Sequence, residues 1–336
     1  MELFAWFIII PFALLLLTIL FNWIVKKRPL KGILNEVKGL FAWRVSDAGG
    51  PDWKLTVFEP QKSWYHVDLN PGLIVRHADG TWDYVLRTND PEQRLFACFR
   101  RCTLMAPVWN QTCLCELDTK THGVINGPSV ILSDPRLEDA RLFQYRRQLF
   151  ASVDTLQDVL MNTKQVVAPI NFRNTRPKVI KSNLNNYVSE SQTEKNWQFF
   201  EHDNRMYVIY SVQPFRVFEL QDFDSKRKVA DHEWSLGHVH ARGGTPPVRL
   251  GKQWYMVTHS KDYKMRAVTF DDSFRITKCT NKPLLNLPGH YIHFPCGLVY
   301  DERKDAFLVS TGINNKQVGI LTVQKSHVDS LLERVF

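Results

Sequence analysis

The feature that most constrains the fold is a short hairpin pattern that occurs five times along the chain. Each copy begins with a polar or proline-containing stretch, continues as an apolar strand, turns, and returns as an aromatic-rich second strand. Alternating apolar residues interrupted by Gly, Pro, Asn and Asp predict an all-β fold. The five copies are LNPGLIVRHADGTWDYVLRT from Leu69, LEDARLFQYRRQLFASVD from Leu137, NWQFFEHDNRMYVIYS from Asn196, GTPPVRLGKQWYMVTHS from Gly244 and FPCGLVYDERKDAFLVSTG from Phe294.

The spacing of the copies predicts the architecture. Their first residues lie about 48 to 68 residues apart, close to the length of a propeller blade with insertions. We expect a five-bladed β-propeller over residues 67–336, preceded by a linker and the first outer strands over 29–66. A β-sandwich with coincidental hairpins is the alternative, and a short helix is expected over 328–335. Because the innermost strands of a propeller surround its axis, the five copies would begin at one rim of a central channel.

Residues 1–28 form a separate segment. Leu3–Val25 is a run without charge that is long enough to cross the ~30 Å hydrocarbon core of a bilayer as a helix. A cleaved signal peptide is the competing interpretation, but no basic region precedes the run and no small-x-small site comes before Lys26. We therefore expect a single-pass N-terminal anchor and a membrane localisation. The side of the membrane is left open, because the cations after the run favour one side, and the sequon at Asn110 and the even number of cysteines favour the other.

Composition and charge exclude some classes of function. With 44% hydrophobic residues the chain can build a packed core. The formal charge is +9, but the basic residues are scattered and no basic stripe alternates with aromatics, so no nucleic-acid partner is expected. The cysteines between Cys98 and Cys115 have no histidines at zinc-site spacing, so we interpret them as structural thiols or disulfides. No metal or organic cofactor is expected.

Polar residues gather at or near the beginning of each copy. Carboxylates, cations and amides in one pocket suit a polyhydroxylated ligand such as a sugar, whose faces would stack on Trp197 or Trp254. The residues concerned are Asn70 and Arg87 in the first copy, Glu138, Asp139 and Arg141 in the second, Glu194, Lys195 and Asn196 in the third, Arg242, Thr245 and His259 in the fourth, and His293, Asn314 and Asn315 in the fifth.

The carboxylates of this set suggest a reaction. Making or breaking a glycosidic bond requires an acid at the leaving oxygen and commonly a second carboxylate. Asp139 together with Glu138 or Glu194 would supply that pair. The alternative is a local salt bridge between Asp139 and Arg141 that ties two blades together.

Five motifs in this order resemble one group of known proteins. They are LNPGL…YVLR, EDARLF, EKNW, RGGTPPV…YMVTHS and FPCGLVYD…LVSTG, and the resemblance covers roughly residues 70–323. They are similar to the five-bladed propeller glycosidases, and most of all to the group of β-mannoside phosphorylases, β-1,2-mannosidases and β-1,2-mannosyltransferases. The resemblance implies that Asp139 is the proton donor to the glycosidic oxygen. It also implies binding of sugar or phosphate by Asn70, Arg87, Arg141, Lys195 and His259.

The chain departs from that group at three places. Ala140 replaces the proline of the group's EDPR motif, Val212-Gln213-Pro214 replaces a phosphate-binding His-Arg-Pro, and Asn315 replaces an acid. Inorganic phosphate would lose charge-assisted hydrogen bonds. A phosphorylase is therefore disfavoured.

Together these observations predict a membrane-anchored enzyme that makes or breaks a glycosidic bond of a mannoside, with transfer favoured over hydrolysis. The substrate would be an oligosaccharide or glycoconjugate, with a sugar phosphate or nucleotide sugar as the candidate donor. A propeller that binds a glycan or a protein without catalysis is the alternative. The expected catalytic residues are Asp139, Glu138 and Glu194, and the expected substrate-binding residues are Asn70, Arg87, Arg141, Lys195, Asn196, Arg242, His259 and Asn315.

Overall fold

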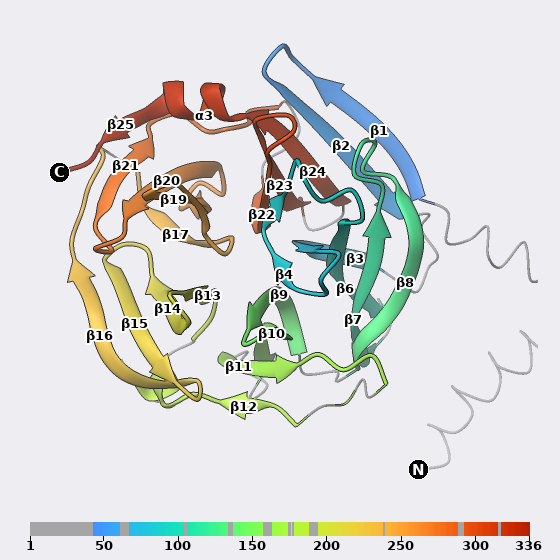
Figure 1. Cartoon of the computed structure of the whole chain (residues 1–336), viewed down its shortest axis with the longest axis horizontal. Helices are drawn as coiled ribbons and strands as arrows, with labels where there is room; N and C mark the ends of the chain where they lie inside the picture. The colour runs from blue at the N-terminus through green and yellow to red at the C-terminus, as the bar shows by residue number, and fades with distance from the viewer. Residues whose placement is uncertain are drawn as a thin grey trace, which may run out of the picture. The chain divides into compact units, whose positions relative to one another are not determined.

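The computed structural model describes most of the chain from Trp43 onward. The described residues form five β-sheets around a common centre (Figure 1). This confirms the predicted five-bladed β-propeller and excludes the β-sandwich. The described ranges are 43–60, 67–103, 106–133, 137–156, 163–173, 176, 178–187, 194–237, 239–287, 292–314 and 317–336.

We number the sheets as blades I to V in the order of their innermost strands. Blade I contains β4 (Trp82–Asp83), β3 (Val67–Arg76), β6 (Arg94–Thr103), β7 (Ala106–Leu117) and β8 (Val124–Ser133). Blade II contains β9 (Leu137–Tyr145), β10 (Gln148–Leu156), β11 (Thr163–Pro169) and β12 (Ile180–Lys181), and is followed by the short helix η1 (Asn183–Asn186). Blade III contains β13 (Gln198–His202), β14 (Arg205–Ser211), β15 (Phe215–Gln221) and β16 (Asp224–His232).

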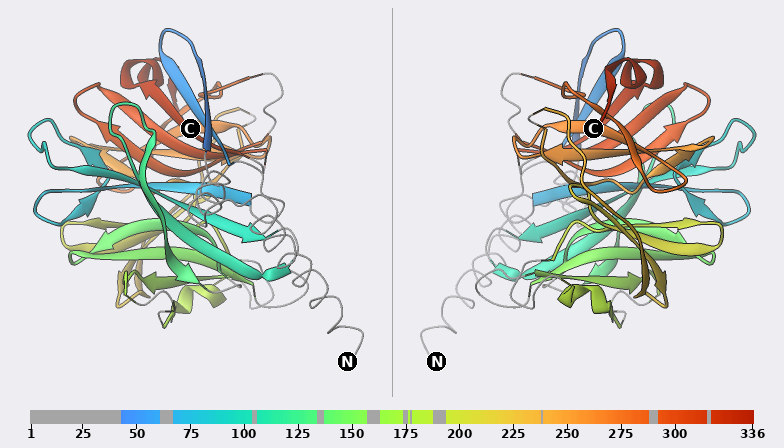
Figure 2. Two further views of the ribbon diagram at one scale, coloured as in Figure 1. Left: turned by 90° about the vertical axis from the view of Figure 1, so that its right-hand side faces the viewer. Right: turned by 90° about the vertical axis from the view of Figure 1, so that its left-hand side faces the viewer.

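The last two blades include strands from both ends of the described chain. Blade IV contains β17 (Ala241–Gly244), β18 (Val248–Leu250), β19 (Gln253–Ser260), β20 (Met265–Asp271), β21 (Ile276–Thr280) and β25 (Leu332–Arg334). Blade V contains β5 (Val85–Leu86), β22 (His293–Asp301), β23 (Ala306–Ile313), β24 (Gln317–Gln324), β2 (Trp53–Pro60) and β1 (Trp43–Gly49). β2 pairs with β24, so the hairpin β1–β2 lies beside the C-terminal strands and joins the two ends of the ring (Figure 2).

Four of the five repeated hairpins are the inner hairpins of blades II to V, whereas the first copy differs. The strand expected directly after the turn at Asp79 is only β4, which pairs with β3 over two residues. Most of β3 pairs with β6, and the next short strand, β5, pairs with β22 of blade V. The Asp83 carboxylate accepts hydrogen bonds from the Val85 amide and from the Arg87 guanidinium. Such local side-chain bonds compete with a continuous strand ladder.

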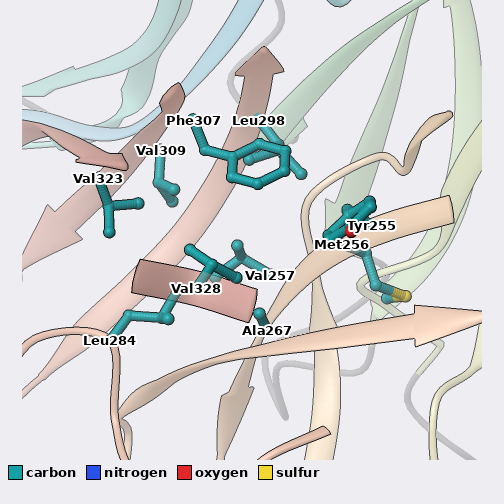
Figure 3. A pocket seen from close by; sticks show the side chains of 10 residues that line it. All are labelled: Tyr255, Met256, Val257, Ala267, Leu284, Leu298, Phe307, Val309, Val323 and Val328. Atoms are coloured by element: carbon teal, nitrogen blue, oxygen red, sulfur yellow. The ribbon is translucent and has the colours of Figure 1, made fainter. Parts of the chain in front are cut away.

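Aromatic and aliphatic side chains fill the spaces between neighbouring blades. Phe200 of blade III meets Trp254 of blade IV with ring centroids 5.1 Å apart, and Tyr255 of blade IV meets Phe307 of blade V at the same distance. A cavity of about 10 Å³ lies among Tyr255, Phe307, Val328 and their neighbours, and Figure 3 shows the side chains that line it. A space of this size holds at most one water, so this region is packed core and no ligand site.

The end of the chain forms a shorter helix than expected. α3 covers Lys325–Leu331, and the next residues join blade IV as β25, which pairs with β21. Val328 anchors the helix in the core between blades IV and V. The strand ladder to β21 therefore takes the residues that the sequence pattern assigned to the last helical turn.

Five cysteines are buried thiols that form no disulfide: Cys98, Cys113, Cys115, Cys279 and Cys296. The side chain of Cys102 lies outside the described residues. Burial in apolar surroundings raises the pKa of the Cys98 thiol to about 12, which disfavours the thiolate needed for redox or metal chemistry. For these five residues the structural-thiol interpretation holds.

The expected membrane localisation is corrected by the structure. Among the described residues, no helix is long and apolar enough to cross a bilayer. The longest helix named above, α3, has seven residues, whereas a spanning helix needs about 20. The run Leu3–Val25, on which the expectation rested, lies outside the described residues.

Candidate active site

The innermost strands β3, β9, β13, β17 and β22 surround the centre of the ring (Figure 1). Four of them are irregular near their N-terminal ends. The ladder skips Asn70-Pro71 in β3, Asp139-Ala140 in β9, Gly243 in β17 and Cys296 in β22. A β-bulge releases residues from the ladder and redirects their side chains. The bulges therefore lie where the sequence places its polar residues.

Backbone conformation explains the residue types at three of these positions. The φ angle is +50° at Asn70, +49° at Asp139 and +63° at Asn196. Asn and Asp adopt left-handed backbone at less cost than other residues with a side chain. The left-handed bend near the beginning of the strand therefore favours Asn or Asp, and the short polar side chain lies near the centre of the ring.

Asp139 and Glu138 form the core of the candidate site. The Asn70 side-chain amide donates to Asp139 Oδ1 at 2.6 Å, joining blades I and II. Arg100 of β6 lies between the two acids, with Nη2 at 2.9 Å from Glu138 Oε1 and Nη1 at 4.0 Å from Asp139 Oδ1. Burial raises the pKa of Glu138, the nearby Arg100 opposes this rise, and Asp139 adds to it. The sequence reasoning did not include Arg100 in the site.

Arg141 is a buried residue that connects the backbone of Asp139 to the neighbouring blades. Its side chain is only 1% exposed. Nε donates to the carbonyl of Gly244 and Nη2 to Asn196 Oδ1, each at 2.9 Å, and Nη1 donates to the main-chain carbonyl of Asp139 at 3.2 Å. The guanidinium also lies over the ring of Phe294, 5.7 Å from its centroid. Arg141 therefore joins blades II, III, IV and V. Its hydrogen bond with Asp139 is to the main-chain carbonyl, in contrast to the carboxylate salt bridge that was the alternative interpretation.

A third acid, Asp154, was missed by the sequence reasoning. It faces Glu138 across the β9–β10 ladder and is 3% exposed. Its Oδ1 has no hydrogen-bond partner among the described residues. Burial, and then the charge of Asp139, raises the pKa of Asp154 to about 8, so this carboxyl is neutral near pH 7. The only signal in the sequence was an acid near the end of the repeated hairpin, and its position depends on the bulge in β9.

Glu194 is held away from the acid pair. Its carboxylate accepts a hydrogen bond from the Tyr210 hydroxyl at 2.7 Å. Its main chain bonds to Thr163, which places it beside β11. Burial raises the pKa of Glu194, and the hydrogen bond from Tyr210 opposes the rise. The structure therefore brings Glu138, and not Glu194, next to Asp139.

His259 lies among several cations on the blade IV side of the site. Its ring packs 4.8 Å from the ring of Phe294. Burial lowers the pKa of His259 to about 4, a hydrogen bond with Gly243 raises it, and the charges of Arg141, Arg242 and Lys195 lower it further. The imidazole is therefore neutral near pH 7. The charge of Lys195 also lowers the pKa of Glu138 and of Asp154. This lysine therefore lies near the acids as well as near His259.

Other predicted residues lie outside this cluster. Arg87 pairs with Asp83 at 2.5 Å, near β4, which pairs with the end of β3 opposite to Asn70. Trp197 and Trp254 are 1% and 4% exposed, so neither offers a face to a sugar. Asn315 lies outside the described residues.

Comparison with known proteins gives matches in structure alone. No family model and no curated protein matches the sequence. A β-1,2-mannobiose phosphorylase from Listeria innocua, in complex with β-1,2-mannobiose, superposes with a TM-score of 0.52 and 12% identity over 87% of this chain and 92% of its own. A GDP-Man-dependent mannosyltransferase from Leishmania mexicana gives a TM-score of 0.50 and 11% identity over 77% and 86%.

A third solved structure extends the same group. It was solved in a study of a family of mannoside phosphorylases that contains glycoside hydrolases targeting β-1,2 mannosidic linkages in Candida mannan. The superposition has a TM-score of 0.54 and 10% identity over 81% of this chain and 87% of that one. The resemblance seen in the sequence motifs is thus confirmed for the fold. At 10–12% identity the likeness establishes the five-bladed propeller and no specific activity.

Proposed function

We propose that this protein is a carbohydrate-active enzyme that makes or breaks a glycosidic bond of a mannoside, with Asp139 as the general acid. The observation that carries the proposal is the position of Asp139. A bulge releases it from β9 at the centre of the ring, Asn70 holds its Oδ1 at 2.6 Å, and Glu138 stands beside it on Arg100. The fold shared with enzymes of β-1,2-mannosides supports the choice of substrate class.

The hydrogen bond from Asn70 fixes the orientation of the Asp139 carboxyl group. The amide nitrogen of Asn70 can only donate, so it engages Oδ1 and leaves Oδ2 free to exchange a proton with the substrate. That proton would pass to the glycosidic oxygen as the bond to the sugar breaks. Glu138 is the partner carboxylate, because it adjoins Asp139 and Glu194 does not. Asp154 is neutral near pH 7, since its pKa is about 8, and adds no further negative charge.

The contacts of Gln213 also disfavour phosphorolysis. Its Nε2 donates to the carbonyl of Trp234 at 2.8 Å, and its Oε1 accepts from the amide of Ala241 at 2.9 Å. Gln213 stands where the similar proteins have a phosphate-binding cation. Its side chain is neutral, and both of its polar atoms are hydrogen-bonded to main-chain groups. Free phosphate would gain no charge-assisted bond from it.

Transfer is favoured over hydrolysis by the charges at the rim. Lys195 and Arg242 have exposed side chains and no ion pair among the described residues. Water as the acceptor and a neutral sugar as the leaving group need no such cations. A charged donor would be stabilised by them.

The proposal is tested with the full-length protein and two matched variants. Asp139→Asn removes the proton donor, whereas Asp203→Asn makes the same change at an exposed turn residue with nearly the same φ, +48° against +49°. Each protein is incubated with β-1,2-mannobiose or longer β-mannosides, alone or with mannose 1-phosphate or GDP-mannose, and the products are read by mass spectrometry. We expect turnover in the wild type and in Asp203→Asn, and its near-complete loss in Asp139→Asn.

Two results would contradict the proposal. Turnover by Asp139→Asn equal to that of the wild type would remove Asp139 from the catalytic role. Absence of turnover in all three proteins, with equal saturable sugar binding, would indicate a propeller that binds glycan without catalysis.

A further inference from the structure

We propose that blade II carries a docking surface for an acidic segment of a partner protein. This basic surface consists of the exposed ring of Phe172 together with five exposed cations: Arg146, Arg147, Arg173, Lys178 and Lys181.

The basic surface lies away from the candidate active site. Asp139 stands near the beginning of β9, whereas Arg146 and Arg147 form the turn after the end of that strand. Lys181 belongs to β12, the outermost strand of blade II (Figure 1). A partner bound there leaves the centre of the ring accessible, so the inference does not depend on the proposed function.

The fold gathers cations that are scattered along the sequence. β10 pairs with β11, and beyond this ladder the amide of Ile170 donates to the carbonyl of Leu149 at 2.9 Å. The chain that follows β11 therefore begins beside the turn that carries Arg146 and Arg147. This following stretch, residues 170–187, holds four Lys or Arg and no Asp or Glu, so its own sequence does not balance its charge.

The cations of the basic surface lack the partners that cations of other blades have. In the part of the chain that the structure describes, none of these five cations forms an ion pair. By contrast, Glu219 of blade III pairs with Arg227 at 2.6 Å, and Asp272 of blade IV pairs with Arg249 at 2.8 Å. Carboxylates of a partner would provide the charge-assisted hydrogen bonds that the described chain does not supply here.

Two acids of the neighbouring blades lie within range of this charge. Hydrogen bonds from Thr81 lower the pKa of Asp79, and the charge of Arg147 lowers it further. Burial raises the pKa of Glu201, and Arg146 opposes this rise. Within the described residues neither acid forms an ion pair with these arginines. Two acids facing five cations leave a net positive surface that attracts an acidic partner.

The end of the segment is fixed to blades II and III. Asn185 of η1 acts as a neighbouring strand would, because its Oδ1 accepts from the amide of Gln165 at 2.8 Å and its Nδ2 donates to the carbonyl of Gln165 at 2.7 Å. The amide of Asn183 donates to Asp224 Oδ1 at 2.8 Å, and Asn183 Oδ1 accepts from the amide of Ser225 at 2.9 Å. A surface held in this way loses less conformational entropy when a partner binds.

Phe172 indicates the class of partner. Its side chain is 58% exposed, whereas Phe143 and Phe150 of the same blade are 1% and 6% exposed. Aromatic residues and arginine are enriched at protein interfaces, and three of the five cations are arginines. A protein segment can cover the Phe172 ring with an apolar side chain while its carboxylates meet the cations. A polyanion without apolar groups would leave this ring in water.

The test uses the full-length protein and labelled synthetic peptides, with binding read by fluorescence anisotropy. One peptide is rich in glutamate and contains phenylalanine, and its analogue has serine in place of phenylalanine. The variants are Arg173→Glu with Lys178→Glu, and Phe172→Ala. The matched control is Lys252→Glu with Lys282→Glu, which changes the net charge equally at exposed lysines elsewhere. All replaced side chains are exposed, and unfolding midpoints check that each variant is folded.

We expect the wild type and the control to bind the phenylalanine peptide more tightly than its serine analogue. Arg173→Glu with Lys178→Glu should weaken both peptides about tenfold or more, because two attractive charges become repulsive. Phe172→Ala should weaken the phenylalanine peptide about fivefold and leave the serine analogue unchanged. Higher salt should weaken both peptides.

Three results would overturn the inference: no binding of either peptide by the wild type, an equal loss in the control, or wild-type affinity for both peptides in the double variant. Phosphatidylserine vesicles and heparin are measured with the same proteins. If the double variant loses vesicle or heparin binding while the wild type shows no preference for the phenylalanine peptide, the surface belongs to a membrane or a glycan, and the choice of a protein partner is wrong.

Discussion

Replacing Arg141 by methionine tests whether one buried side chain holds four blades in position. Methionine has a similar length but donates no hydrogen bond, so the carbonyl of Gly244 and Oδ1 of Asn196 would each lose a donor at 2.9 Å. A hydrogen bond to a charged donor contributes about 1.5–3 kcal/mol. Two such losses, partly offset by the removal of a buried charge, give an expected decrease of about 3 kcal/mol in the free energy of unfolding.

The matched control is Arg216→Met. Arg216 also pairs with an acid, Asp231, at 3.0 Å, but both side chains are about one-third exposed. Exposed ion pairs of this kind contribute at most about 1 kcal/mol. Unfolding in urea, followed by tryptophan fluorescence, compares the two variants with the wild type.

The comparison has a clear outcome in either direction. A loss in Arg141→Met no larger than that in Arg216→Met would refute the supporting role of Arg141. Arg141→Lys gives a further check, because lysine keeps the charge but lacks the planar fork that reaches three acceptors. We expect its stability to lie between those of the wild type and Arg141→Met.

Three further predictions concern burial. The folded pKa of Asp154 is raised from its usual 3.8 to about 8, so the folded state keeps a proton that the unfolded chain loses, and stability falls as the pH rises through this range. In thermal unfolding, the stability of Asp154→Asn relative to that of the wild type should therefore increase as the pH rises from 4 to 8. A stability difference that does not change with pH would contradict this. The folded pKa of His259 is lowered from 6.5 to about 4, so stability falls as the pH drops from about 6.5 to about 4, and His259→Gln should lessen that fall between pH 7 and pH 5. Trp254→Phe should cost about 1–3 kcal/mol of stability without changing the affinity for mannobiose, and a selective loss of sugar affinity in titration would restore Trp254 as a stacking residue.

The strand pattern was predictable because it is local. Alternation of apolar residues and the turn residues between them placed the inner hairpins of blades II to V, and their number and spacing predicted the propeller. The same reasoning failed in blade I, where the side chain of Asp83 satisfies nearby donors and ends the strand after two residues. Side-chain hydrogen bonds of this kind do not appear in a hydrophobic pattern.

The site was predictable in part for the same reason. Asn70, Asp139 and Asn196 each stand at a backbone bend that favours Asn or Asp, so the residue type itself marked the position. Arg100 and Asp154 lie on second strands, and the face on which such a side chain emerges changes with a shift of one residue in register. The bulges that set this register are visible only in the paired strands.

The sequence alone thus determined the class of structure and the chemical types at its centre, because periodicity and left-handed backbone positions are properties of neighbouring residues. Only the tertiary structure decided which groups meet. In the tertiary structure, Asn70 bonds to Asp139 and Arg141 to Gly244 across separate blades. Glu194 bonds to Tyr210, and Trp197 and Trp254 are buried. Closing a ring brings together strands that lie far apart along the chain, and the burial and charge that follow depend on that closure.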